Sequence, residues 1–243
     1  MSALALRLAG PLQAWGAAAR FARRTTENAP TKSGILGLLA AAQGRERTDD
    51  LSDLARLRFG VRVDQRGVRV RDYQTAKHLD TGNSMPVSER FYLADAVFVA
   101  AVEGEHALVE ELYRAVRQPV YLPYLGRRSC PPAHPVDLGL HRDATVERVL
   151  ADEPWQAAEW HQRRRRGERE VSLDVFVDAE PDDVRTDSLR DLPLSFDPLH
   201  RRYALRAVRS GTVRVANPHR RADTSQTQSA VPEHNPVLPL EGD

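Results

Sequence analysis

Five residues near the start of the chain have the types and the spacing needed to bind a phosphate group. They are Arg20, Arg23, Arg24, Lys32 and Ser33. The last two stand at the start of segment 33–43, where the isoleucine and leucine spacing predicts a helix. Free backbone N–H groups at a helix start attract anions, and the basic side chains add positive charge. The segment therefore predicts a site for a phosphate-bearing partner.

An ordinary helix start is the alternative interpretation of the same residues. Thr31 or Ser33 would then be the N-cap, and Gly34 and Gly37 would let the helix pack closely. A nucleotide-binding P-loop needs two glycines before its Lys-Ser/Thr pair, but Thr26 and Thr31 occupy those positions. ATP or GTP hydrolysis is therefore not expected.

A second candidate phosphate site is the loop Gly126-Arg127-Arg128, which prolines flank on both sides. Glycine lets a backbone approach a ligand closely, and an arginine fork binds phosphate with two hydrogen bonds. A surface turn with solvated arginines is the alternative. Cys130 follows this loop, and no sequence cue marks a partner that would activate it, so we expect a small packed residue.

Two aromatic residues are candidates for stacking on bases. Trp15 follows an apolar segment, and Tyr73 ends an alternating one. Aromatic faces bind single-stranded RNA without reading its sequence. A core position is the alternative, and for a tryptophan directly after a strand it is the more frequent outcome.

Tyr73, Lys77 and His78 could also cleave RNA without a metal. Such cleavage needs a base to activate the 2′-OH, a cation to stabilise charge and an acid for the leaving group. The three residues supply these types within six positions. A metal-independent endoribonuclease is therefore the alternative function.

Composition narrows the class of protein. The chain has 243 residues, 41% hydrophobic and 28% charged, which fits a soluble globular protein. No apolar run reaches the length of a membrane span, and the single cysteine excludes an internal disulfide, so we expect a cytoplasmic protein. His134 and His141 are interpreted as loop residues, and no metal site is predicted. Net charge is only +1, but residues 1–80 carry 14 Lys/Arg against 8 Asp/Glu, which permits a basic face.

The elements that must position these residues follow from hydrophobic periodicity. The predicted strands are 3–9, 59–64, 68–73, 93–104, 171–177 and 202–208. The predicted helices are 33–43, 51–58 and 105–117. We expect 59–64 and 68–73 to pair as a hairpin around Gly67. The polar segment 74–90 is either a loose loop or a protruding hairpin. The order of elements indicates an α+β fold.

Five blocks of the sequence resemble the CasD family of type I-E CRISPR systems, in the family's order and spacing. The blocks, between about residues 4 and 136, are LRLAGPLQAWG, PTKSGILGLLAAAQGR, LRFGVRVDQRG, RDYQT and PYLGRRSCPPAHP. The resemblance implies a ferredoxin-like domain of the RAMP superfamily at 1–140, with a β-hairpin thumb inserted at 74–92. We further expect a small β-rich region at 141–215 and a disordered tail at 216–243.

The same resemblance implies a function. Members of the family hold the 5′ handle of the guide RNA in the surveillance complex Cascade without a catalytic role, beside a backbone subunit and a large subunit that reads the PAM. Target DNA would then meet this chain only through the assembled complex. The expected RNA contacts are Trp15, Arg20, Arg23, Arg24, Lys32, Ser33, Tyr73, Lys77, His78, Gly126, Arg127 and Arg128.

Overall fold

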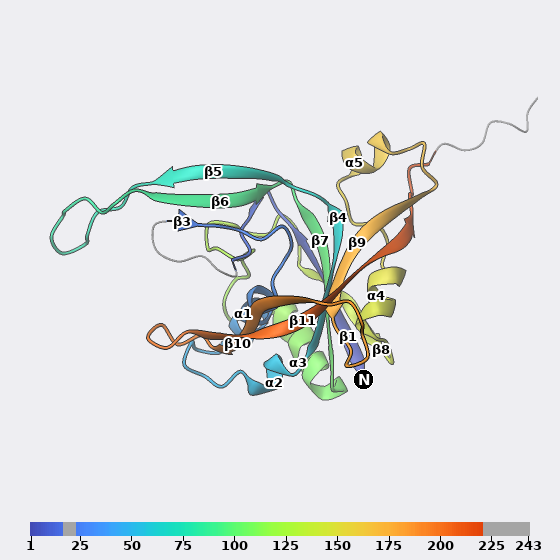
Figure 1. The fold of residues 1–243 in the computed structure, drawn as a ribbon, viewed down its shortest axis with the longest axis horizontal. Helices are drawn as coiled ribbons and strands as arrows, with labels where there is room; N and C mark the ends of the chain where they lie inside the picture. The colour runs from blue at the N-terminus through green and yellow to red at the C-terminus, as the bar shows by residue number, and fades with distance from the viewer. Residues whose placement is uncertain (17–22, 221–243) are drawn as a thin grey trace, which may run out of the picture.

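Two β-sheets and five helices make up the part of the chain that the computed structural model describes, residues 1–16 and 23–220 (Figure 1). The larger sheet is antiparallel throughout. The mixed α and β content confirms the α+β class predicted from the sequence. Arg20 and segment 221–243 lie outside the described residues. None of the helices in the described ranges is both long and apolar enough to cross a membrane.

The larger sheet has seven strands in the order β10-β11-β9-β4-β7-β1-β8. Their bounds are β1 Ser2–Ala9, β4 Arg58–Gln65, β7 Val97–Gly104, β8 Asp137–Arg142, β9 Glu170–Asp178, β10 Asp187–Ser195 and β11 Arg202–Ala216. β1 and β7 lie inside the sheet and are buried on both faces, which explains their nearly continuous apolar sequences.

Helices cover both faces of this sheet. The helices are α1 Lys32–Ala42, α2 Ser52–Ala55, α3 His106–Arg117, α4 Val146–Asp152 and α5 Glu159–Arg164. The leucines of β1 point to one face and share a core with α1 and α3, while Ala3 and Ala5 point to the other face and pack with α4. The close approach of α4 requires Gly60 on β4, since a Cβ there would lie 2.4 Å from Val146.

The C-terminal strands belong to this same sheet. We expected 171–177 and 202–208 to belong to a smaller β-rich region; residues 171–177 pair with residues 209–215 of β11, while residues 202–208 of β11 pair with β10. However, β9 also pairs with β4, so the C-terminal strands extend the N-terminal sheet. The expected boundary at residue 140 falls within β8, which pairs with β1. Asn217, in the expected tail, is buried at 3% exposure, so order extends past residue 216.

The second sheet contains β2 Leu12–Gln13, β3 Arg23–Arg24, β5 Val68–Gln74 and β6 Ser88–Ala94. The predicted pairing of 59–64 with 68–73 is wrong, because β4 pairs with β7 and β9 while β5 pairs with β6. The chain crosses between the sheets at Gly67, where a Cβ would lie 2.7 Å from the Ala94 oxygen. The predicted strand 93–104 is divided between β6 and β7, because the chain crosses back between the sheets at Asp95, which has a φ of 55°.

The β5–β6 hairpin projects far from the rest of the molecule (Figure 1). Seven residue pairs join the two strands, from Val68 with Ala94 to Gln74 with Ser88. Beyond them the chain continues into an exposed tip, residues 75–87, in which an isolated bridge joins Lys77 and Ser84. The insertion at 74–90 is thus the end of a longer hairpin that begins at residue 68.

Candidate nucleic-acid interface

One face of the β5–β6 hairpin combines arginine and aromatic side chains. Opposite residues of an antiparallel pair lie on the same face, and side chains alternate along each strand. The register places Arg69 opposite Leu93, Arg71 opposite Phe91 and Tyr73 opposite Glu89, all on one face. We call this surface, together with Arg23 of the adjacent β3, the hairpin face.

Cations and rings of the hairpin face lie against each other. The Arg71 guanidinium lies 5.0 Å from the centre of the Tyr73 ring, and the Arg23 guanidinium lies 5.5 Å from the centre of the Phe91 ring. Tyr73 is 55% exposed. Such contacts hold the planar groups in place, and the Tyr73 ring and the two guanidinium groups stay exposed, as a surface that stacks on bases requires.

The charge of this region is strongly positive. Segments 23–24, 66–94 and 126–129 together hold nine Lys or Arg and three Asp or Glu. Arg66 pairs with Asp174, and Arg23 lies 4.0 Å from Glu89. Arg69 donates to two uncharged oxygens, the carbonyl of Thr26 and Oδ1 of Asn28. No other cation of these segments pairs with a carboxylate of the described chain, so much of the positive charge is available to phosphates.

The two arginines of the loop at 126–129 differ in their surroundings. Arg127 Nη2 donates to the Arg24 carbonyl at 2.9 Å, and its guanidinium lies 4.6 Å from the centre of the Tyr92 ring. Arg127 therefore joins the loop to β3 and β6. Arg128 is exposed, with no ion pair within the described part of the chain. Arg24, next to Arg127, is also exposed, so Arg24 and Arg128 both remain candidates for phosphate contact.

Gly126 has a packing role. Its φ is +84°, and a Cβ there would lie 1.8 Å from the Ala14 oxygen. The glycine is thus required by the contact between the loop and the chain after β2, which the hydrogen bond from Ala14 N to the Leu125 oxygen fixes at 3.0 Å. We expected this glycine to let a ligand approach, but it lets the protein's own backbone approach.

The anion at the start of α1 is supplied by the protein itself. Thr31 is the N-cap and accepts a hydrogen bond from Gly34 N, as the ordinary interpretation predicted. Lys32 N donates to Oδ2 of Asp191 at 2.8 Å, and Lys32 Nζ donates to Oδ2 of Asp178 at 2.8 Å. The sequence therefore predicted the helix-start anion site, but not that a carboxylate of the same chain fills it.

This ion pair is part of a buried network. Arg206 on β11 donates to Asp178 and Asp191, each at 2.7 Å, so two cations and two carboxylates neutralise each other. Lys32 is 5% exposed and Ser33 is 7% exposed. The expectation that these two residues contact RNA phosphates is corrected here, because burying them next to paired carboxylates leaves no open site.

Trp15 is a core residue. Its exposure is 0%, and its Nε1 donates to Oε1 of Gln13 at 3.0 Å. The ring lies against α1 at Gly34, where a Cβ would approach it to 2.9 Å. Trp15 therefore cannot stack on a base, and the alternative of a core anchor is confirmed.

The tip of the hairpin holds the remaining candidates. Lys77 and His78 are exposed, and His78 Nδ1 accepts a hydrogen bond from Thr81 N at 3.4 Å. The nearest carboxylate to His78 is that of Asp80, at 3.9 Å and itself exposed. Both residues are open to solvent, a setting suited to contact with an extended chain of phosphates.

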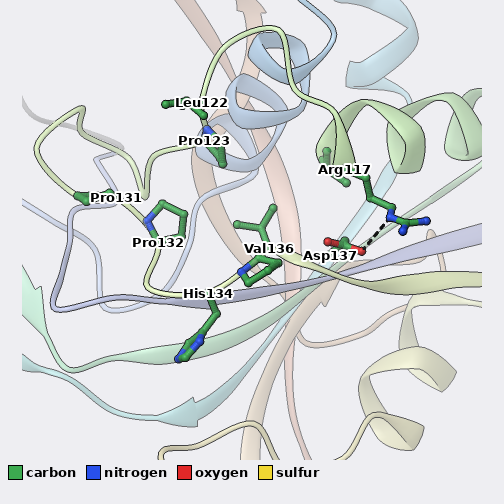
Figure 2. Close-up of a pocket in the computed structure, with 10 residues that line it drawn as sticks. Arg117, Leu122, Pro123, Pro131, Pro132, His134, Val136 and Asp137 are labelled. Atoms are coloured by element: carbon green, nitrogen blue, oxygen red, sulfur yellow. Dashed lines mark ion pairs between the residues drawn. The ribbon is translucent and has the colours of Figure 1, made fainter.

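A pocket lies away from the hairpin face. About 530 Å³ in volume, it lies between the end of α3 and segment 131–137, and prolines dominate its lining (Figure 2). Its one lining arginine, Arg117, lies 3.7 Å from Asp137. The pocket is therefore apolar with a neutralised rim, unlike a phosphate site.

Cys130, in the same loop, is buried, and burial raises the pKa of its thiol. In the described ranges, no group of three or more His, Cys, Asp or Glu could hold a metal ion.

Three residues of the hairpin face were not among the sequence-predicted contacts: Arg69, Arg71 and Phe91. The alternation in VRVRDYQ placed two of them on the same face as Tyr73. What was missing was the partner strand, since pairing with β6 is what adds Phe91 to the surface.

Comparison with known proteins gives the family. The model of the family described as CRISPR-associated protein (Cas_Cas5) matches residues 3–209. The chain belongs to this Cas5 family. The Cas5 chain is 42% identical over 171 residues to the CRISPR system Cascade subunit CasD of Escherichia coli strain K12, covering 61% of this chain and 75% of CasD. The resemblance inferred from the five sequence blocks is thus confirmed.

Solved structures share the fold of this Cas5 chain. One, described as a CRISPR RNA-guided surveillance complex, contains a chain with a TM-score of 0.71 and 34% identity, covering 88% of this chain and 91% of that one. Another, described as the crystal structure of a Cas protein, gives a TM-score of 0.67 and 36% identity, covering 90% and 97%.

Proposed function

We propose that this Cas5 chain is a non-catalytic subunit of a type I-E CRISPR surveillance complex and holds the 5′ handle of the guide RNA. Its relatives include a Cascade subunit and a chain of an RNA-guided surveillance complex. The partners would be the guide RNA, the backbone subunit and the large PAM-reading subunit, with target DNA reached through the assembly.

The proposal assigns a role to each part of the fold. Strands β4-β7-β1-β8 are adjacent in the sheet, with α1 following β1 and α3 following β7. This order supports the proposal of a ferredoxin-like domain of the RAMP superfamily. The projecting β5–β6 hairpin would be the thumb that hooks the RNA where the handle meets the spacer.

The observation that carries the proposal is the hairpin face. Its cations lie beside the exposed ring of Tyr73 and the half-buried ring of Phe91, on an element that projects from the body. Guanidinium groups bind the sugar-phosphate backbone and rings stack on splayed bases, so the pair of chemistries fits single-stranded RNA. The proposed contacts are Arg23, Arg24, Arg69, Arg71, Tyr73, Lys77, His78, Phe91, Arg127 and Arg128; Arg20 remains a proposed contact outside the described residues.

Replacing two cations of the hairpin tests this role. Arg71→Gln with Lys77→Gln removes two exposed charges that have no ion pair in the described chain. The affinity for handle RNA should fall, and the slope of log affinity against log salt should decrease by about 1.4, or about 0.7 for each phosphate contact. The matched control is Arg47→Gln with Arg56→Gln, two exposed arginines near α2, on another part of the surface. An equal effect of both variants would reject the hairpin assignment.

The endoribonuclease alternative depends on Tyr73, Lys77 and His78. Incubating the purified chain with repeat RNA in EDTA tests it directly. The proposal expects no cleavage by the chain, with or without His78→Ala. Cleavage that disappears in His78→Ala would establish the alternative.

A further inference from the structure

Helix α5 and the residues that follow it form an arginine-rich surface far from the hairpin tip. Figure 1 places α5 towards one end of the molecule and the hairpin tip at the other. The sequence here reads EWHQRRRRGERE, residues 159–170. We call the surface made by four of its exposed residues the α5 surface: Trp160, Arg164, Arg166 and Arg169. Glu170, which ends the segment, is also exposed. None of the four residues of the α5 surface is used by the proposed handle site.

Only part of this arginine run is neutralised. Arg163 pairs with Glu159 at 2.5 Å, and Arg165 pairs with Glu168 at 2.5 Å. Arg164, Arg166 and Arg169 are exposed, and none has a carboxylate partner within residues 1–16 and 23–220. Neighbouring arginines repel each other unless an anion is present, so this cluster favours an anionic ligand with several charges.

The arginines are not needed to complete the helix end. Arginine near a helix C-terminus often serves the last carbonyls. Here Asn217 does so, since its Nδ2 donates to the carbonyls of Gln162 at 3.2 Å and Arg165 at 2.9 Å. Gln162 in turn donates to the carbonyls of Trp155 and Ala157, at 2.7 and 3.0 Å. Both amides are buried, so they fix α5 firmly and leave the exposed guanidinium groups without a structural partner.

An accessible aromatic ring, that of Trp160, lies four residues before Arg164 on α5, on the same face of the helix. Trp160 is 56% exposed, while Trp15 and Trp155 are 0% and 4% exposed. Trp160 is in edge contact with His161, with ring centres 5.4 Å apart, and His161 is in edge contact with Trp155 at 5.7 Å. The ring of Trp160 thus contacts the half-buried His161 while much of it stays exposed. An exposed ring next to unpaired arginines is the combination that binds a single strand by stacking and phosphate contact.

We propose that the α5 surface is a second nucleic-acid site, which binds a single strand without reading its sequence. RNA and DNA share the phosphates and bases that such a surface contacts, so either strand fits its chemistry. An acidic protein surface would satisfy the arginines but would gain little from the exposed ring of Trp160, and is the less favoured ligand.

Tryptophan fluorescence tests the site selectively, because Trp160 is the one exposed tryptophan of the three in the chain. An oligouridylate or oligodeoxythymidylate of about 20 nucleotides should quench the fluorescence of the full chain. Trp160→Phe should abolish the quenching. Arg164→Gln with Arg166→Gln should weaken it and decrease the salt slope by about 1.4. The control Arg47→Gln with Arg56→Gln should leave both unchanged.

The outcomes separate this site from the handle site. Arg71→Gln with Lys77→Gln should leave Trp160 quenching intact, whatever it does to handle RNA. Quenching that survives in Trp160→Phe, or a wild-type chain that neither probe quenches, would overturn the proposal. It would also be overturned if polyglutamate bound the chain through Arg164 and Arg166 while the oligonucleotides did not.

Discussion

Neighbouring arginines of the loop at 126–129 have different tasks. Arg127 holds the loop to Arg24 and to the Tyr92 ring, whereas Arg128 is exposed and unpaired within the described chain. A charge-assisted hydrogen bond and a stacked guanidinium contribute to folding, while an exposed charge contributes mainly to binding. The two residues therefore should not be tested only as a pair.

The separated variants give a prediction at this scale. Arg127→Gln should reduce the free energy of unfolding by about 2 kcal/mol. Arg128→Gln should leave the unfolding midpoint unchanged and weaken handle RNA. Urea denaturation and RNA titration of the two variants check this. Equal losses of stability in both would mean that Arg128 is not a free surface cation.

Lys32 shows that a buried basic residue contributes to stability and not to RNA binding. Lys32→Met removes one of two cations from the network around Asp178 and Asp191. The unfolding free energy should fall by about 3 kcal/mol, because an uncompensated buried charge remains. RNA affinity of the folded protein, measured well below the denaturation midpoint, should match the wild type. A loss of affinity without a loss of stability would return Lys32 to the RNA contacts.

At the scale of elements, the hairpin tip is separable from the fold. Residues 75–87 are exposed, and the strands on either side are already paired from Val68 to Gln74. Replacing 75–87 with Asn-Gly, the preferred two-residue hairpin turn, should keep the thermal midpoint within a few degrees. The shortened chain should bind handle RNA more weakly, because Lys77 and His78 are lost. Thermal unfolding and RNA titration test both parts, and unchanged RNA affinity would exclude the tip from the site.

Local pattern predicted the elements better than their partners. The predicted helices 33–43 and 105–117 match α1 and α3 within one residue at each end, because apolar spacing is a local property. The partners of strands and of buried side chains, by contrast, are residues far away in the sequence. The partners of Lys32 lie 146 and 159 residues away in the sequence, so no local pattern could show that it is buried. The hairpin face could not be predicted for the same reason, because it depends on the register between β5 and β6.

At the scale of the whole molecule, the C-terminal strands complete the N-terminal ones. β9 covers the edge of β4, and Asp178, Asp191 and Arg206 supply the charges around Lys32. A fragment of residues 1–142 would leave β4 as an edge and Lys32 without both carboxylates. We expect that fragment to be unfolded by far-ultraviolet circular dichroism, while 1–220 unfolds in one transition. A folded, cooperative fragment would show that the two parts are independent domains.

The fold also separates two basic surfaces. The hairpin face and the α5 surface lie towards opposite ends of the molecule (Figure 1), with the shared sheet between them. Ligands at the two surfaces should therefore bind independently, and a probe at one should not displace a probe at the other.

The central claim is that the hairpin holds the 5′ handle, and cross-linking in the assembled complex tests it most directly. A guide RNA with photoreactive 4-thiouridine in its 5′ handle would be assembled with all subunits and irradiated, and the cross-linked peptides identified. The account predicts handle cross-links to the hairpin, segment 68–94, that decrease with Arg71→Gln and Lys77→Gln but not with Arg47→Gln and Arg56→Gln. Handle cross-links confined to other subunits, or to α5 in this chain, would contradict it.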